Sequence, residues 1–215
     1  MRIEFVFDTV CPWCFIGKRR FERALAARAG ARLQVLWRPF LLNPDLPLDG
    51  IDRHSYLDRK FGGPARVNRM HGAVAAAGRS EGIDFAFDRI QRTPNSLHSH
   101  RLIRFSARFG RESETVDALY RAYFCEGRDI GRLDELAAIA GETGLSAADA
   151  AAFLHSDTEV AATMGDNARS HRLGVNGVPC VIVDGLYAMA GAQDPDILTR
   201  LFDVAREAEA EAALS

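Results

Sequence analysis

Cys11-Pro12-Trp13-Cys14, directly behind the strand-like run 2–8, is the stretch that decides the fold. Proline is favoured at the first position of a helix, so Pro12 places Cys11 at the N-cap and Cys14 in the first helical turn. Unpaired backbone N–H groups and the positive end of the helix dipole favour an anion there, so we expect the Cys11 thiol to ionise readily. One accessible and one buried thiol at this spacing predict a dithiol redox site.

Two other uses of a Cys-x-x-Cys pair fit this sequence less well. A structural zinc site needs two further ligands at a similar spacing, but Cys125 and Cys180 stand alone and the six histidines form no paired motif. A purely structural disulfide is disfavoured because so short a loop constrains the unfolded chain little. We therefore predict redox chemistry, with no metal and no organic cofactor.

The composition is that of an ordinary globular protein. The chain has 215 residues, of which 47% are hydrophobic and 26% charged, enough for one domain or two. A net charge of -2 gives no reason to expect nucleic acid or an anionic membrane as a partner. The basic cluster 18–20 is interpreted as a solvated helix face. Residues 1–6 lead straight into the first strand and leave no room for a leader peptide, so we expect a cytoplasmic protein whose other cysteines are free.

The order of predicted elements indicates an α/β fold in which a thioredoxin-like domain is split by an insertion. The elements of its two halves are strand 2–8, helix 15–29, strand 33–38, strands 180–183 and 186–190 around a two-residue Asp184-Gly185 turn, and a helix that starts at Asp194-Pro195 and fades over 207–215. Strand, helix, strand, then hairpin and helix is the thioredoxin order. We predict residues 1–45 and 174–215 to form this discontinuous domain.

Residues 46–173 are predicted to form an all-helical insertion domain. Prolines at 44 and 47 stop the second strand from continuing. The helix candidates are 52–61, 64–77, 96–109, 114–124, 133–143, 147–153 and 158–172. A capping-box pattern over 156–159 starts the last of them, and Gly174 is a natural stop.

Nearly the whole chain resembles the FrnE-like branch of the DsbA family. The segments that carry the resemblance are 8–20, 94–102, 123–130 and 174–193. The resemblance implies a thiol-disulfide oxidoreductase or isomerase that acts on protein or small-molecule disulfides. Cys11 is then the nucleophile and Cys14 the resolving thiol.

The same resemblance implies a substrate-binding surface around the cysteines. From the residues alone, Val178-Pro179 is an ordinary trans proline junction at the start of a strand. Thioredoxin-like proteins resemble one another in carrying a cis-proline opposite the cysteines, so Val178 and Pro179 become the expected substrate-binding loop. Pro12 and Trp13 border the same place, although Trp13 can equally serve to cover the cysteines. Asn95 approaches from the helical domain, where a helix cap is its simpler role.

Relatives of similar fold supply the alternative function. In 2-hydroxychromene-2-carboxylate isomerases and kappa-class glutathione transferases a serine typically stands where this chain has Cys11, and glutathione is bound. A role for glutathione as a reductant or cosubstrate therefore remains an alternative here. A homodimer is likewise an open possibility.

The remaining polar candidates carry less weight. Cys180 follows Pro179, but strand alternation points it away, so a core residue is favoured over a third redox thiol. Asp8 fits either a group that acts on the thiols, as a proton acceptor or by raising their pKa through repulsion, or a cap of the turn between strand and helix. His98 and His100 are two apart on a helix and make a poor metal pair.

Overall fold

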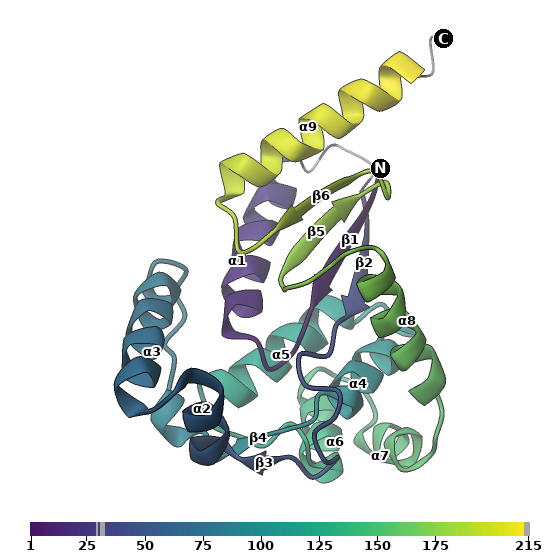
Figure 1. Ribbon diagram of the computed structural model, residues 1–215. Helices are drawn as coiled ribbons and strands as arrows, with labels where there is room; N and C mark the ends of the chain where they lie inside the picture. Colours follow the sequence, from purple (N-terminus) through teal and green to yellow (C-terminus); the bar gives the residue numbers. More distant parts are fainter. Residues whose placement is uncertain (29, 31–32, 213–215) are drawn as a thin grey trace.

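A four-stranded mixed sheet forms the centre of the structure, a computed structural model that describes residues 1–28, 30 and 33–212. Its strands are β1 (Arg2–Phe7), β2 (Gln34–Pro39), β5 (Cys180–Val183) and β6 (Tyr187–Ala190). The spatial order is β2-β1-β5-β6, with β1 parallel to β2 and antiparallel to β5 (Figure 1). The first and last parts of the chain therefore share one sheet, as the element order predicts.

Different helices cover the two faces of this sheet. Helices α1 (Pro12–Ala26) and α9 (Pro195–Ala212) pack on one face, while α8 (Val160–Arg172) lies beside β2 (Figure 1). Successive side chains of β1 face opposite sides of the sheet. Phe5 and Phe7 therefore pack in the main core with α1, whereas Val6 belongs to a small apolar cluster on the opposite face. Cys180 pairs with Val6 in register and shares that second cluster.

Between the two halves of the sheet the chain forms the helical part expected. Its elements are β3 (Ile51–Asp52), α2 (Arg53–Phe61), α3 (Pro64–Arg79), the short 3-10 helix η1 (Phe87–Arg89), β4 (Arg92–Thr93), α4 (Leu97–Ala107), α5 (Glu112–Phe124), α6 (Leu133–Glu142), α7 (Ala147–His155) and α8. The α/β class is confirmed. The predicted all-helical insertion also contains one short antiparallel pair, in which Ile51 faces Thr93. The division at 45/46 and 173/174 stays a prediction, since one continuous core joins both parts: Phe15 of α1 stacks on Tyr120 of α5 with centroids 4.9 Å apart.

Local chain geometry accounts for several differences from the predicted boundaries. Helix α1 begins at Pro12, as the Cys11-Pro12 pair predicts, three residues before the apolar run 15–29, and the predicted end at residue 29 lies outside the described residues. The β5–β6 turn has three residues, because Asp184 and Gly185 both take positive φ and Leu186 stays in the turn. The capping box over 156–159 does not form: Glu159 has φ 66° and α8 starts after it without a side-chain cap.

Two further predictions are wrong for reasons of packing. Lys18 is fully buried and is not part of a solvated face, because carboxylates on α1 and α5 surround its ammonium group. The last helix does not fade at residue 207 but continues to Ala212, and residues 213–215 lie outside the described part. Gly174, with φ 80°, ends α8 as predicted.

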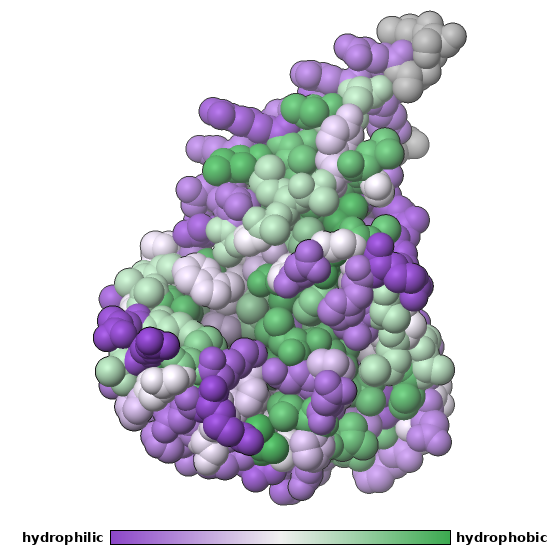
Figure 2. Space-filling model, viewed as in Figure 1, coloured by the Kyte–Doolittle hydropathy of each residue, from purple (hydrophilic) through white to green (hydrophobic). Residues whose placement is uncertain are grey.

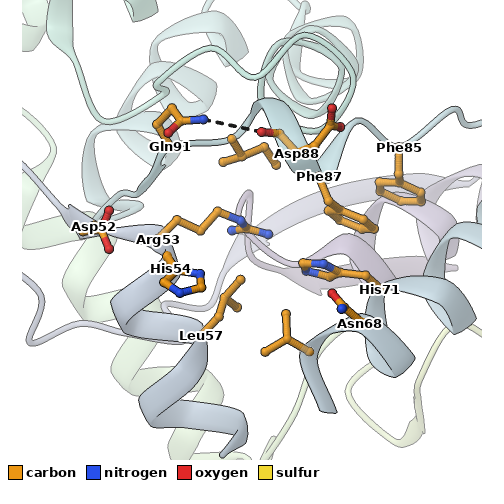
Figure 3. Close-up of a pocket in the computed structure, with 12 residues that line it drawn as sticks. Asp52, Arg53, His54, Leu57, Asn68, His71, Phe85, Phe87, Asp88 and Gln91 are labelled. Carbon is orange, nitrogen blue, oxygen red and sulfur yellow. Dashed lines mark hydrogen bonds between the residues drawn. The ribbon is translucent and has the colours of Figure 1, made fainter. Parts of the chain in front are cut away.

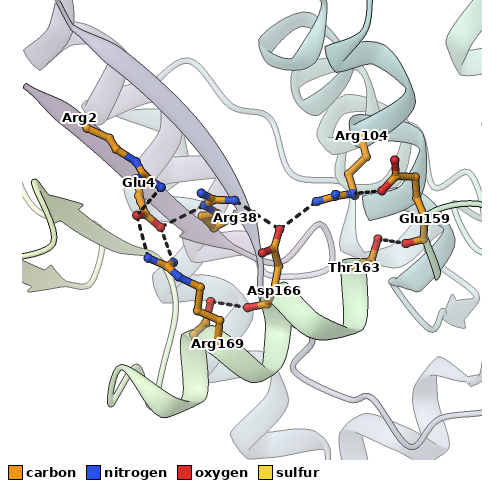
Figure 4. Close-up of polar contacts among 9 residues, drawn as sticks. Arg2, Glu4, Arg38, Arg104, Glu159, Thr163, Asp166 and Arg169 are labelled. Atoms are coloured by element: carbon orange, nitrogen blue, oxygen red, sulfur yellow. Dashed lines mark hydrogen bonds and ion pairs between the residues drawn. The ribbon is translucent and has the colours of Figure 1, made fainter. Parts of the chain in front are cut away.

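An ion-pair network ties the sheet to the helical part (Figure 4). Glu4 of β1, only 3% exposed, accepts hydrogen bonds from Arg38 of β2 and from Arg169 of α8. Asp166 of α8 continues the network to Arg104 of α4. Burial raises the pKa of Glu4, but the hydrogen bond from Arg169 and the nearby arginine charges lower it by more, so the pKa lies below its usual value.

Hydrophobic residues gather in the middle of the face shown in Figure 2, and hydrophilic residues surround them. Across the described residues, no helix combines the length and the apolar character that a membrane span requires.

Candidate active site

Cys11 occupies the N-cap of α1, the position that the sequence predicts. Its backbone is extended, with φ -98° and ψ 113°, and Pro12 follows at the first helical position. The Cys14 N–H donates to the Cys11 carbonyl at 3.0 Å, which closes the first turn. The Cys11 thiol donates to the Val178 carbonyl at 3.7 Å, across the site. Cys11, the nucleophile predicted from the sequence, thus lies at the N-terminal end of α1 and contacts the predicted substrate-binding loop.

Cys14 lies behind Cys11 and is fully buried, whereas Cys11 is 6% exposed. Both cysteines are free thiols. Burial raises the pKa of the Cys14 thiol well above its usual value, and the hydrogen bond and charge of Cys11 raise it further. Cys11 is thus buried too, and not exposed as the sequence predicts, but it lines a cavity and Cys14 does not.

The Val178–Pro179 peptide bond is cis, as the resemblance implies. Gly17 of α1 permits the loop to pack directly on the helix, since a Cβ at that position would lie 2.7 Å from Pro179 Cγ. The Pro179 carbonyl accepts from the Gly191 N–H at 2.7 Å, which ties the loop to the end of β6. These contacts fix the loop opposite Cys11.

A cavity of about 260 Å³ opens beside Cys11, and we call it the active-site cavity. Its lining comes from the active-site turn, the linker and α2, α3, η1, β4 and α5: Val10, Cys11, Pro12, Trp13, Leu42, Asn43, Arg53, Tyr56, Leu57, Lys60, Phe61, Met70, His71, Val74, Phe87, Thr93 and Tyr123. Pro12 and Trp13 border it, and Trp13 is 40% exposed. The lining contains two basic side chains and no acidic one, so the cavity is apolar with a positive charge.

Asn95 lies elsewhere, as a structural cap. It is 4% exposed, its Oδ1 accepts from the Leu97 N–H at 3.0 Å, and its Nδ2 donates to the Leu46 carbonyl at 2.7 Å. It is not part of the active-site cavity lining. This placement fits the capping role, and a substrate contact by Asn95 stays a prediction.

Asp8 is buried below the cysteines. Its carboxylate accepts from the Leu42 N–H at 2.7 Å and lies 3.5 Å from His100 Nε2. Tyr120 donates its hydroxyl to the Asp8 carbonyl at 3.2 Å, and burial raises the pKa of Tyr120 well above its usual value. Asp8 Oδ1 accepts from the Val10 N–H at 3.3 Å and so caps the turn before Cys11, one of the roles predicted for it. After burial and Cys11, the charge of Asp8 is a further cause that raises the pKa of Cys14, which is another.

The other two cysteines lie apart from this pair. Cys180 packs in the apolar cluster on the opposite face of the sheet, and burial raises its pKa. Cys125 is half-buried at the end of α5, and burial raises its pKa as well. Among the described residues, no group of three His, Cys, Asp or Glu side chains is arranged to hold a metal ion.

Sequence reasoning missed the far wall of the active-site cavity. Arg53 of α2, His71 of α3 and Thr93 of β4 belong to that wall, yet they are up to 40 positions apart in the chain. No motif links them, because only the packing of α2 and α3 beside β4 brings them together. The β3–β4 pair, which sets this packing, was itself not predicted.

Known proteins resemble this chain in sequence and in structure. The family profile described as a DSBA-like thioredoxin domain matches residues 2–203. The crystal structure of a probable DsbA oxidoreductase, SCO1869 from Streptomyces coelicolor, superposes with a TM-score of 0.88 and 29% identity, over 96% of this chain and 90% of that one. An uncharacterized protein of Bacillus subtilis (strain 168), YwbO, is 26% identical over 74% of each chain. The cytosolic disulfide reductase DsbM of Pseudomonas aeruginosa, solved with GSH, shares the fold with a TM-score of 0.67 and 17% identity, over 99% of this chain and 100% of that one.

The family profile covers almost the whole chain, including β1, the cysteine pair, the helical part and the cis-proline loop. The protein belongs to the DSBA-like thioredoxin domain family of thiol-disulfide oxidoreductases.

Proposed function

We propose that the protein exchanges a Cys11–Cys14 disulfide with disulfides of proteins or small molecules. The observation that carries this proposal is the pair of thiols at the start of α1, with Cys11 against Val178 at 3.7 Å and Cys14 fully buried behind it. A thiolate at Cys11 attacks a substrate disulfide and releases the first substrate thiolate. Cys14 then attacks Cys11 and releases the second.

The environment of Cys14 supports this order of steps. Two of the causes that raise its pKa are the hydrogen bond and the charge of Cys11. Burial, the largest cause, stays in place, but the two contributions of Cys11 are lost once its sulfur is bound in a mixed disulfide, so the pKa of Cys14 is then raised by less.

Substrate contacts are assigned to the surface around Cys11. Pro12 and Trp13 border the active-site cavity. Val178 and Pro179 are outside its lining, but the Val178 carbonyl contacts the Cys11 thiol from the cis-proline loop. Asn95 is assigned an indirect role, through its hydrogen bonds to the linker. A homodimer stays a prediction that sedimentation analysis tests.

We propose a cytoplasmic location and reduction or isomerisation as the direction of exchange, with glutathione as the reductant. The cytosolic glutathione pool is reducing compared with most members of this fold, so net oxidation is disfavoured there. The solved DsbM structure is described as a cytosolic disulfide reductase with GSH, which supports the same assignment.

The proposal is tested with variants in which one cysteine is replaced, by measuring how fast each catalyses the reduction of insulin disulfides by glutathione. Cys11→Ser should abolish catalysis, and Cys14→Ser should accumulate a mixed disulfide on Cys11. Cys125→Ser, a half-buried cysteine outside the site, is the matched control and should keep the wild-type rate. Full activity of Cys11→Ser would refute the assignment. Full glutathione-dependent isomerase or transferase activity in Cys14→Ser would favour the alternative function.

A further inference from the structure

Two fully buried basic side chains of this protein have partners that compensate their charge. Lys18 has the carboxylates of Glu22 and Asp117 at 2.5 and 2.9 Å. Arg101 donates to the backbone carbonyls of residues 153, 154, 156 and 158 at the end of α7. Such compensation is the rule, because an isolated charge away from water is costly.

Arg53 has weaker compensation within the described part of the chain, where its Cζ lies 5.8 Å from the centroid of the Tyr123 ring. It is 8% exposed, and its guanidinium donates to a single protein group, the Tyr123 hydroxyl, at 3.0 Å. No carboxylate of the described residues lies within 4.0 Å of that guanidinium. The same tyrosine hydroxyl donates to the Arg92 carbonyl at 3.1 Å, so it carries no negative charge to offer. The protein thus buries one guanidinium that its described residues leave without an anion.

One nitrogen of this guanidinium and two polar atoms of other side chains that line the same cavity are also unpartnered. Arg53 Nε, His71 Nε2 and Thr93 Oγ1 are all buried, and none has a hydrogen-bond partner among the described residues. Figure 3 shows the side chains of Arg53 and His71 pointing toward each other across a second cavity, which adjoins the first. Burial, and then the charge of Arg53, lower the pKa of His71, so at neutral pH the ring is uncharged. Arg53 Nε and Thr93 Oγ1 offer donors to an anion, and so does His71 Nε2 in the tautomer that carries the proton there. We call these three atoms the Arg53 recess.

The position of the Arg53 recess connects it to the reacting thiol. Its three residues and Cys11 all line the active-site cavity of about 260 Å³. Lys60 adds a second positive charge to the lining, and most of the remaining wall is apolar or aromatic. A ligand that fills this space therefore combines an apolar body, an anionic end at Arg53 and a sulfur at Cys11.

We propose that the Arg53 recess binds a carboxylate, and that the small-molecule substrates of this protein are thiols or disulfides that carry one. The planar guanidinium matches a carboxylate in geometry, with paired N–H donors. The inference rests on the proposed function for its sulfur chemistry. In the first step the Cys11 thiolate bonds to one sulfur of the substrate disulfide, and the other sulfur leaves with the electron pair of the broken S–S bond. Cys14 loses its proton to water and displaces the second thiolate, so the cysteine pair is oxidised and the substrate is reduced.

Two disulfide reagents of similar size test this assignment on the reduced protein. Dithiobis-nitrobenzoate carries a carboxylate on each ring, and dithiodipyridine is neutral. We expect Arg53→Gln to lower the ratio of their rate constants at Cys11, anionic over neutral, by about tenfold or more, since a hydrogen bond to a charged group is worth roughly 1.5–3 kcal/mol. Arg59→Gln is the matched control, because Arg59 is an exposed arginine of α2 outside both cavity linings. An equal change of the ratio in both variants would overturn the carboxylate site.

A binding measurement without sulfur chemistry separates this inference from the proposed function. Phenylpropanoate should raise the melting temperature of the wild-type protein, whereas phenylpropanol, which has the same body and no charge, should raise it less. The extra rise in melting temperature that phenylpropanoate gives over phenylpropanol should be lost in Arg53→Gln and partly kept in Arg53→Lys. Equal effects of the two compounds on the wild-type protein would refute the recess even if Arg53→Gln does not fold. Failure of both disulfide reagents to react at Cys11, with phenylpropanoate still bound, would instead refute the proposed exchange function.

Discussion

Replacing Gly17 by alanine tests how closely α1 packs on the cis-proline loop. An added Cβ would lie 2.7 Å from Pro179 Cγ, 3.3 Å from Pro179 Cβ and 3.5 Å from Ala192 Cβ. Carbon atoms in good contact are about 3.5–4.0 Å apart, so the first contact is too short by roughly 1 Å. Neither group has a flexible end that can turn away: one is attached to the helix backbone and the other is a proline ring.

The magnitude follows from two opposing effects. Overpacking of this kind costs about 1–3 kcal/mol. Alanine is favoured over glycine inside a helix by up to about 1 kcal/mol. With a helix gain of about 1 kcal/mol, we expect Gly17→Ala to lower the free energy of unfolding by up to about 2 kcal/mol. For a chain of this size that lowers the melting temperature by up to roughly 8 °C.

Thermal unfolding followed by circular dichroism measures this shift. Gly72→Ala is the control: Gly72 is an exposed glycine inside α3, and an added Cβ meets no atom within 4 Å. The control should melt at the wild-type temperature or a few degrees above it. Gly17→Ala should also slow disulfide exchange, because movement of the loop changes the Cys11–Val178 contact. If Gly17→Ala melts at or above the wild-type temperature, the packing argument is wrong.

Three other predictions concern the buried polar groups. Glu4→Gln should lower the stability at pH 7. Because the pKa of Glu4 is lowered in the folded protein, its ionised form stabilises the fold above about pH 4.5, and this stabilisation is lost as the pH falls through the folded-state pKa, so the difference from wild type should shrink there. A difference that does not depend on pH in denaturant titrations would contradict this. Iodoacetamide at pH 8 should label Cys11 much faster than the fully buried Cys14, whose pKa is raised; equal labelling by peptide mass mapping would contradict the assignment of roles. Arg101→Met should destabilise the protein by ~3 kcal/mol or more, since the carbonyls at the end of α7 lose their donor. Arg108→Met, at an exposed site, is the control and should change the melting temperature little.

The features that the sequence predicted are those set by local chemistry. Proline at the first helical position defines the start of α1, and strand alternation places Cys180 away from Cys11. Strand β5 and the ends of α2, α5 and α8 come from runs of apolar residues and stop signals that need no tertiary information.

Features set by distant contacts could not be predicted. The three-residue turn after β5 depends on the β5–β6 register and on a hydrogen bond from the Arg2 N–H to Asp184. Burial of Lys18 needs Asp117 of α5 beside α1, and no pattern in either helix shows this. The Arg53 recess depends on the two-residue strands β3 and β4, which are too short to leave a periodic signal. The cysteines were thus found from the sequence, while the active-site cavity beside them was not.

A redox titration of the Cys11–Cys14 pair tests the central claim most directly. The protein is equilibrated in glutathione buffers of graded ratio, thiols are alkylated, and the linkage is mapped by mass spectrometry, with Cys11→Ser as the control. We predict one reversible two-electron transition between about -270 and -120 mV, with Cys11 linked to Cys14 in the oxidised form. Absence of that linkage at every ratio, or a glutathione adduct on Cys11 as the only product, would contradict the dithiol mechanism.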